Sequence, residues 1–298
     1  MRIIKNWSTH INMPLQAPPS EPTAGHATSW DAVDESLTRE AVIGTAVDVV
    51  EWNQALERVH AWVKNSESHY VCFCNVHALV TARLDPLFSS ALGHADLVVP
   101  DGAPVAWMMR RLGHIRQPQI RGTDFFWNYC AIAAERSESI FLLGSKPDTL
   151  TRLQARLRTA FPRLLIAGAY SPPFRPLTED EDRAIVGAII ASGAGTIWVS
   201  LGCPKQELWM AAHYGAVPAV MLGVGAAFAF KAGTVREAPH WMRAAGLEWL
   251  HRLCSEPRRL LLRYFVTNTV FLLLGGRQLL SHFYRRMQLR LRQVIARK

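Results

Sequence analysis

The sequence predicts an α/β protein with a Rossmann-like, mostly parallel sheet flanked by helices and a basic helical C-terminal appendage. Three observations support this prediction. Short apolar runs alternate with amphipathic stretches from residue 41 onward, several of these runs end in Gly, Pro, Asn or Asp, and the net positive charge is concentrated in residues 251–298. Strands that alternate with helices are typical of a parallel sheet covered on both faces.

The expected strands and helices follow one another regularly along the chain. Each expected strand is an apolar run, and the segment after it repeats apolar residues every three or four positions. The expected strands are 42–47, 70–74, 95–99, 139–144, 164–170, 196–202 and 219–225, and the expected helices begin near residues 52, 77, 104, 147, 178 and 204.

The chain divides into three expected parts. Residues 1–40 lack the apolar segment of a secretory signal and are rich in Pro, Ser, Thr and Ala, which predicts a disordered lead-in. Residues 41–245 form the expected α/β core, and residues 246–298 the basic appendage. Its apolar stretch, 265–276, is about a dozen residues long, whereas a spanning helix needs about 20. We therefore expect no bilayer crossing.

The charge of the appendage indicates an anionic partner. Residues 251–298 contain eleven basic residues and one acidic residue, a net charge of +10, whereas the remainder holds 22 basic and 23 acidic residues. An amphipathic basic helix is typical of a membrane interface, where each basic residue adds about 1 kcal/mol. The alternative is a helix that packs on the core and exposes its basic face to solvent. Nucleic-acid binding is a weaker interpretation, because the tail has no recognised nucleic-acid-binding motif. The apolar stripe is Leu279, Leu280, Phe283, Tyr284, Met287, Leu291 and Val294.

The five cysteines are scattered along the chain. Cys72 and Cys74 share one face of an expected strand, so either a metal pair or two core thiols would explain them. No second Cys or His pair at ligand spacing accompanies them, which favours reduced core thiols in a reducing compartment.

Several strand ends carry residues suited to ligand binding, because ligands of open parallel sheets bind beyond the carboxyl ends of the strands. In LGCPKQE, Gly202 allows a tight turn and Pro204 suits the first helical position. The N–H groups of Lys205, Gln206 and Glu207 would then face a diphosphate, Lys205 would add charge, and the side chains of Gln206 and Glu207 could reach ribose or base. An ordinary strand–helix turn fits the same spacing. The other candidates are Asn75, Gly144, Ser145, Gly223 and Gly225.

Asp101 is the candidate catalytic carboxylate. It follows an expected strand and stands between Pro100 and Gly102. An inverting sugar transfer needs a base that removes the proton from the attacking hydroxyl. The spacing by itself also fits an N-cap, since a helical pattern follows directly.

Nine blocks carry a family resemblance in this order: NVHALV, PDGAPV, RGTD, FLLGSKP, SPPF, VSLGCPKQE, GVGAAF, GLEWLHRL and EPRRLLLRY. Together they resemble the WecG/TagA/CpsF family of bacterial glycosyltransferases (family 26) over about residues 42–265. The resemblance implies a metal-independent, inverting transfer of a hexose or N-acetylhexosamine-type sugar from a UDP-sugar to a polyprenyl-diphosphate-linked saccharide, in cell-surface or exopolysaccharide biosynthesis. It also implies that the appendage completes the active site and docks peripherally on the cytoplasmic face of the inner membrane.

The resemblance also suggests roles for individual residues. Asp101 corresponds to the proposed general base, and Asn75 to the asparagine after the preceding strand. Lys205, Gln206 and Glu207 would lie beside the UDP. Guanidinium groups pair bidentately with phosphate oxygens, and the corresponding arginines are Arg252, Arg258 or Arg259, and Arg263.

Three positions depart from the pattern of many relatives. Phe73 replaces a threonine, Gln119 an arginine, and Glu237 stands where an arginine begins an Arg-Ala-Pro triplet. These departures bear on the sugar contacts and hence on the identity of the donor.

Two other functions remain open at this level. The doubly wound pattern and the GVG turn (223–225) also fit a nicotinamide-dependent oxidoreductase, although the third fingerprint glycine and the expected acid are missing. A non-catalytic membrane scaffold of a polysaccharide assembly complex is the second alternative. The sequence leaves open whether the chain forms a homo-oligomer.

Overall fold

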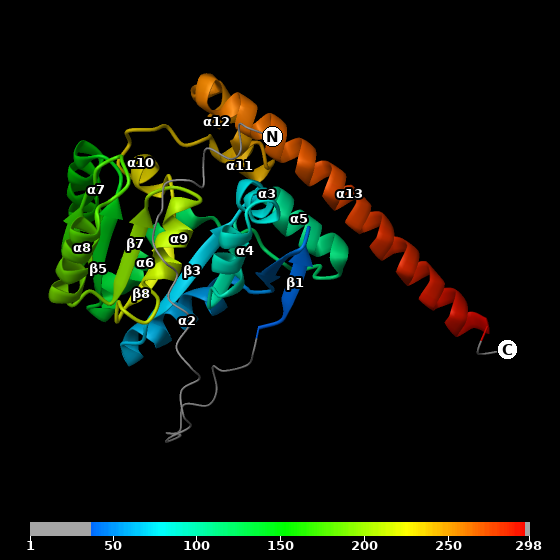
Figure 1. Ribbon diagram of the computed structural model, residues 1–298, viewed down its shortest axis with the longest axis horizontal. Helices are drawn as coiled ribbons and strands as arrows, with labels where there is room; N and C mark the ends of the chain where they lie inside the picture. The colour runs from blue at the N-terminus through cyan, green and yellow to red at the C-terminus, as the bar shows by residue number, and fades with distance from the viewer. Residues whose placement is uncertain (1–36, 296–298) are drawn as a thin grey trace, which may run out of the picture.

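A six-stranded parallel sheet forms the centre of the protein (Figure 1). The computed structural model describes residues 37–295. The strands lie in the order β4-β3-β8-β7-β5-β6, and each neighbouring pair is parallel. The predicted α/β, Rossmann-like fold class is thereby confirmed. The strand bounds are β3 His69–Cys74, β4 Leu97–Pro100, β5 Ser139–Gly144, β6 Leu165–Tyr170, β7 Thr196–Ser200 and β8 Val220–Gly223.

Helices cover both faces of the sheet because the side chains of each strand alternate between two apolar cores. In β3, Tyr70, Cys72 and Cys74 belong to one core, and Val71 and Phe73 to the other. The first core is covered by α3 (Val76–Leu84), α4 (Pro86–Gly93), α5 (Ala103–Leu112), α8 (Glu179–Ser192) and α9 (Lys205–Ala212), and the second by α2 (Trp52–Asn65), α6 (Gly122–Arg136), α7 (Pro147–Ala160) and α10 (Ala227–Lys231).

The expected strand 42–47 is instead an antiparallel hairpin outside the main sheet. Strand β1 (Arg39–Val42) pairs with β2 (Thr45–Asp48). Ile43 and Gly44, with φ of 46° and 93°, form the turn, and two positive φ angles suit a tight two-residue hairpin turn. The prediction was wrong because it followed the apolar run through this turn. Strand β1 also includes Arg39 and Glu40, which belong to the expected lead-in. The first 36 residues of that lead-in lie outside the described part of the chain.

The C-terminal appendage consists of α11 (His240–Ala244), α12 (Glu248–Ser255) and the 39-residue helix α13 (Pro257–Ile295). Leu260 and Phe271 of α13 are buried in the body. Gly275 lies close to Met108, where an added Cβ would be 3.3 Å from the sulfur. Gln278 accepts a hydrogen bond from the backbone of Ile43 at 2.8 Å. Helix α13 is therefore packed along the body, and its C-terminal end stands away from it (Figure 1).

Helix α13 exposes an apolar stripe that is longer than the sequence predicted. Its exposed large apolar side chains, apart from Leu289, fall within an arc of roughly 140° at 3.6 residues per turn. The stripe lengthens because segments expected to be separate form one continuous helix. Among the described residues, no helix meets the length and hydropathy that a membrane span requires. The exposed members are Leu261, Leu262, Phe265, Leu272, Leu273, Leu280, Phe283, Tyr284 and Met287.

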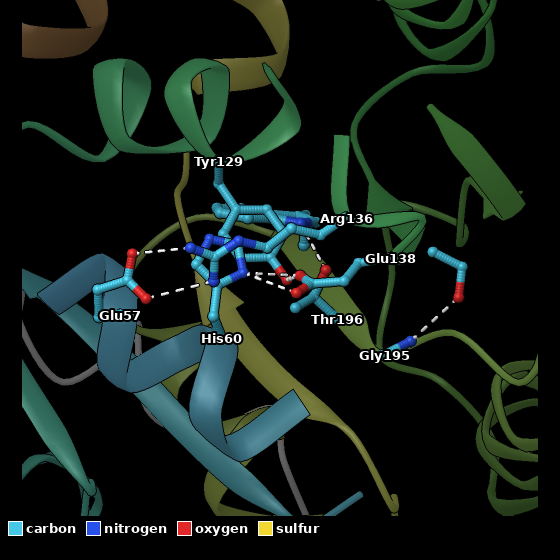
Figure 2. A network of polar contacts seen from close by, with 9 residues as sticks. Glu57, His60, Tyr129, Arg136, Glu138, Gly195 and Thr196 are labelled. Atoms are coloured by element: carbon cyan, nitrogen blue, oxygen red, sulfur yellow. Dashed lines mark hydrogen bonds and ion pairs between the residues drawn. The ribbon is translucent and has the colours of Figure 1, made fainter. Parts of the chain in front are cut away.

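A polar network braces the amino ends of the strands (Figure 2). Glu138, just before β5, accepts hydrogen bonds from His60 of α2 at 2.8 Å and from Tyr129 of α6 at 2.5 Å. The two rings stack at 4.6 Å. Burial raises the pKa of Glu138, but these hydrogen bonds outweigh burial and leave the pKa below its ordinary value. This network ties α2 and α6 together at the edge of the sheet opposite to its carboxyl ends.

Candidate active site

The order of the sheet creates a crevice between β7 and β5. Helix α9 leaves β7 toward the first core, whereas α7 leaves β5 toward the second. Ligands of open α/β sheets bind where neighbouring connections diverge in this way. The two strand ends approach closely here, because a Cβ added at Gly144 would lie 2.6 Å from the Ser200 backbone. A glycine is therefore required at the point where the crevice opens.

A cavity of about 1460 Å³ extends from this crevice along the carboxyl ends of the strands to the appendage. It brings together nearly all of the site residues that the sequence analysis selected. Gly144 supports the cavity from behind without lining it, and Arg258 lies outside it. The selected residues that line it are Asn75, Asp101, Ser145, Gly202, Pro204, Lys205, Gln206, Glu207, Gly223, Gly225, Arg252, Arg259 and Arg263.

Asp101 lies at the end of β4 and faces the cavity. Its backbone N–H donates to Cys74 of the neighbouring strand at 2.9 Å. The alternative N-cap role is wrong, because Gly102 is the N-cap of α5. Burial and, to a smaller extent, Glu248 raise the pKa of Asp101, whereas Arg121, Arg252 and the Gly122 N–H lower it, and the resulting pKa is about 7. A carboxyl group with this pKa can exchange a proton near neutral pH.

Asn75 and His77, at the start of α3, line the same cavity as Asp101. Asn75 is the N-cap of α3, and its Oδ1 accepts from the Ala78 N–H at 3.1 Å. This capping bond fixes the side chain that the sequence placed at the site. Burial, together with smaller effects of the Arg263 and Arg252 charges, lowers the pKa of His77 to about 4. The His77 imidazole is therefore neutral at pH 7.

The LGCPKQE segment differs from the arrangement expected of it. Pro204 is the N-cap of α9 and follows a cis peptide bond, so it does not occupy the first helical position. The N–H of Gln206 donates to Gly202 at 3.0 Å, and the N–H of Glu207 bonds its own carboxylate. Two of the three N–H groups expected to face a diphosphate are thus engaged within the chain. Lys205 is exposed at the cavity.

Gln206 is a buried clamp for the glycine turns and does not project as a ribose contact. Its Oε1 accepts from the N–H groups of Gly202 and Gly225, at 3.2 and 3.0 Å. Its Nε2 donates to the Gly223 carbonyl at 3.0 Å and to Glu207 at 2.9 Å. One amide therefore joins the ends of β7 and β8. Gln206 lies at the site as predicted, but the partners of its amide are the glycine turns, which lie up to 19 residues away in the sequence.

Glu207 is a buried carboxyl group with a relative exposure of 1%. Burial raises its pKa to about 7, against smaller lowering effects from Gln206, its own N–H and the Cys203 thiol. Because the folded pKa lies above the ordinary value of 4.5, the folded protein holds this proton more tightly than the unfolded chain. The cost to stability is therefore absent below about pH 4.5, grows as pH rises, and is complete above about pH 7.

Glu207→Gln should stabilise the protein at pH 8 and leave its stability at pH 4.5 nearly unchanged. The shift corresponds to roughly 3 kcal/mol at about 1.4 kcal/mol per pKa unit, which should raise Tm at pH 8 by about 5 °C. Thermal unfolding at the two pH values measures this, with the exposed Glu135→Gln on α6 as the matched control. Equal Tm values for wild type and Glu207→Gln at pH 8 would contradict the raised pKa.

The appendage brings three arginines to the cavity. Arg252 comes from α12, and Arg259 and Arg263 come from the first turns of α13. Arg259 pairs with Glu256 at 2.8 Å, and Arg252 lies over the ring of Phe230 at 5.5 Å. Burial lowers the pKa of Arg263, and the neighbouring arginines contribute to this. The sequence analysis left open Arg258 or Arg259, and the structure places Arg259 at the cavity.

Two residues of the site were missed by the sequence analysis. Arg121, at the start of α6, forms a two-point ion pair with Glu248 of α12, with both N···O distances at 3.0 Å. Both residues line the cavity. They stand in the RGTD and GLEWLHRL blocks, but a separation of 127 residues gave no sign that they pair.

The three departures from the family pattern occupy different places. Phe73 and Gln119 line the cavity, and the Phe73 ring packs against Gly122. Glu237 does not line it and pairs with Lys231 and Arg243, at 3.0 and 3.4 Å. The first two positions can therefore contact a ligand directly, whereas Glu237 acts through its partners.

The cysteines are free, and Cys72, Cys74 and Cys130 are buried. Within residues 37–295, no group of three or more His, Cys, Asp or Glu side chains is arranged to hold a metal ion.

In a comparison with known protein families, the model of the glycosyl transferase WecG/TagA/CpsF family matches residues 40–285. The match includes the whole sheet, the cavity and most of α13.

Proposed function

Because the chain belongs to the WecG/TagA/CpsF family of glycosyltransferases, which act in cell-surface polysaccharide synthesis, we propose that it transfers a sugar from a UDP-sugar to a polyprenyl-diphosphate-linked saccharide. The transfer inverts the anomeric configuration, with Asp101 as the general base. The observation that carries this proposal is the position of Asp101, whose carboxyl group has a pKa of about 7 and shares one cavity with the glycine turns and the appendage arginines.

The proposed chemistry follows from these groups. The Asp101 carboxylate accepts the proton of the acceptor hydroxyl while its oxygen attacks the anomeric carbon, and the bond from this carbon to the diphosphate breaks. The negative charge that develops on the departing UDP falls near Arg252, Arg259 and Arg263. Fixed guanidinium groups stabilise such a charge without reorganising during the reaction. We propose that they do so without a resident metal.

The position of α13 supports a lipid-linked acceptor. Thr267, Asn268 and Phe271 of this helix line the cavity, and Leu272 both lines it and is 71% exposed. The cavity thus opens beside the apolar stripe of α13. A stripe lying in the membrane interface would present the cavity to a diphosphate held at the bilayer surface. We therefore propose peripheral attachment to the cytoplasmic face of the inner membrane.

The proposed function is tested by UDP release from purified protein. The donors are UDP-glucose, UDP-galactose, UDP-N-acetylglucosamine and UDP-N-acetylgalactosamine, each with a synthetic polyprenyl-diphosphate-linked sugar as the acceptor. We expect release that depends on the acceptor and a rise in Tm with UDP. Stabilisation by NADH and not by UDP would instead favour the oxidoreductase.

The membrane contact is tested by two variants on the exposed end of α13. Phe283→Glu, in the stripe, should weaken binding to vesicles containing phosphatidylglycerol about tenfold more than Ser281→Glu on the other side of the same turn. Both variants add one negative charge, so their difference reports the apolar contact, worth about 1.5–3 kcal/mol for a buried Phe. Vesicle co-sedimentation measures this. Equal losses would show that charge and not the stripe determines attachment.

A further inference from the structure

One short segment links Asp101 to the appendage. The N–H of Ile120 donates to the Pro100 carbonyl at 3.0 Å, and the N–H of Gly122 bonds the Asp101 carboxylate. The residue between them, Arg121, extends toward α12. The backbone that holds the candidate base and the side chain that reaches the appendage therefore belong to the same three residues.

Arg121 is held by two carboxylates. Its Nε and Nη2 each meet one oxygen of Glu248 at 3.0 Å, and its Nη1 meets Asp124 at 2.6 Å. The Arg121 side chain is only 9% exposed. A two-point pair of this kind fixes orientation as well as distance, which a single contact cannot do.

Helix α12 depends on polar contacts for its position. None of its residues is buried, so no apolar core anchors it to the body. It joins α13 through the Ser255–Pro257 connection, and Glu248 in its first turn forms an ion pair with Arg121 of the body. Arg252 follows Glu248 by one helical turn and lines the cavity. The pair that holds Glu248 thus also sets where the Arg252 guanidinium lies.

A chain of ion pairs extends the same contact. Arg243, just before α12, lies 3.7 Å from Asp124 and 3.4 Å from Glu237, and Glu237 pairs with Lys231 of α10 at 3.0 Å. The appendage is therefore joined to α6 and α10 by alternating charges, of which Arg243 lines the cavity.

We propose that Glu248 is a positioning residue for the transfer reaction: its two-point pair with Arg121 holds α12 over Asp101 and thereby places Arg252. The inference rests on the proposed function, in which Asp101 is the base. It adds a role for the appendage that does not involve phosphate binding. In this role a carboxylate of the appendage completes the surroundings of the base.

The charges around Asp101 give the inference a distinctive signature. Asp101 is faced by Arg121 and the Gly122 N–H from α6, by Glu248 and Arg252 from α12, and by the Cys74 thiol from β3. Burial and Glu248 raise the Asp101 pKa, and the positive groups lower it. Removing the Glu248 charge leaves Asp124 as the remaining carboxylate paired with Arg121, so more of the Arg121 charge acts on Asp101. The pKa of Asp101 should then fall, and the acid limb of the rate profile should move to lower pH.

The test compares Glu248→Gln, Arg121→Lys and their double variant in the full-length protein. Single-turnover rates are measured from pH 5 to 9 with the UDP-hexose selected by the release assay, and hydrogen exchange is measured over 247–256. Arg121→Lys keeps the charge but cannot form the two-point pair. It therefore still tests the Arg121–Glu248 pair if Glu248→Gln folds poorly. Glu57→Gln is the matched control, because it breaks the two-point Arg136–Glu57 pair of the opposite sheet edge (Figure 2).

We expect Glu248→Gln to lower the rate by about 10- to 100-fold, to move the acid limb to lower pH and to speed exchange in α12. Arg121→Lys should lower the rate without moving the limb, and the double variant should be no slower than the slower single variant. Unchanged exchange in α12, a rate loss with an unmoved limb in Glu248→Gln, or additive losses would overturn the inference. Wild-type behaviour of Glu248→Gln together with loss of transfer in Asp101→Asn would reject this inference alone and leave the proposed function standing.

Discussion

Replacing Asp101 with asparagine is expected to slow sugar transfer by about 10²- to 10⁴-fold, the usual contribution of a positioned general base. The amide keeps the shape of the side chain but cannot take a proton from the acceptor hydroxyl. UDP binding should persist, because the glycine turns and the arginines are unchanged. Single-turnover assays measure the rate, and the shift of Tm with UDP measures binding.

The control for this variant is Asp180→Asn, on the exposed side of α8, where the carboxylate pairs with Arg183 in the next turn of the same helix. Its transfer rate should equal that of the wild type. A near-wild-type rate in Asp101→Asn would show that another group is the base. Absence of turnover in the wild-type protein across the donor panel, with polymer still formed in cells carrying Asp101→Asn, would favour the non-catalytic scaffold.

Arg252→Gln and Arg263→Gln are each expected to lower the transfer rate by about 10²-fold. Loss of one fixed donor to a developing oxyanion has a cost of this order in other enzymes. Both side chains line the cavity, and both lower the pKa of His77, so their charges act in the same small volume. Single-turnover rates at saturating donor concentration measure the effect.

Arg258→Gln should have a much smaller effect, because its side chain is exposed outside the main cavity. Arg183→Gln, on the distant helix α8, controls for the loss of one positive charge. If the rate falls equally in Arg258→Gln and Arg252→Gln, the arginines act through the net charge of the appendage and not through defined positions. Equal rates in all variants would remove the arginines from the proposed mechanism.

The residues predicted from strand ends do lie together at one cavity, and their functional roles stay predictions. Asp101, Asn75 and the glycine turns follow apolar runs, and parallel strands bring their carboxyl ends to one edge of a sheet. The prediction for Gln206 failed for a physical reason. Its amide bonds Gly202, Gly223 and Gly225, and nothing in a strand–helix pattern distinguishes a buried clamp from a ligand contact at a helix start.

The pairing of Arg121 with Glu248 is the larger omission. Each residue stands in a recognisable block, yet the pair depends on how the appendage folds back over the sheet. Helix α13 shows the same limit. Its apolar stripe was recognised only from Leu279 onward, because Gly275 and Gly276 interrupt the local helical pattern. In the structure Gly275 lies within α13, where its close approach to Met108 explains the missing side chain.

The sequence by itself determined the α/β class, the alternation of strands and helices, the family and the concentration of positive charge in the appendage. These properties depend on local periodicity, composition and the order of motifs, all of which lie within short windows of the chain. Only the tertiary structure decided which side chains meet in the cavity, which arginine faces it, and that a carboxylate of α12 pairs beside the candidate base. Such contacts join residues more than a hundred positions apart, where packing geometry and not local pattern determines the partner.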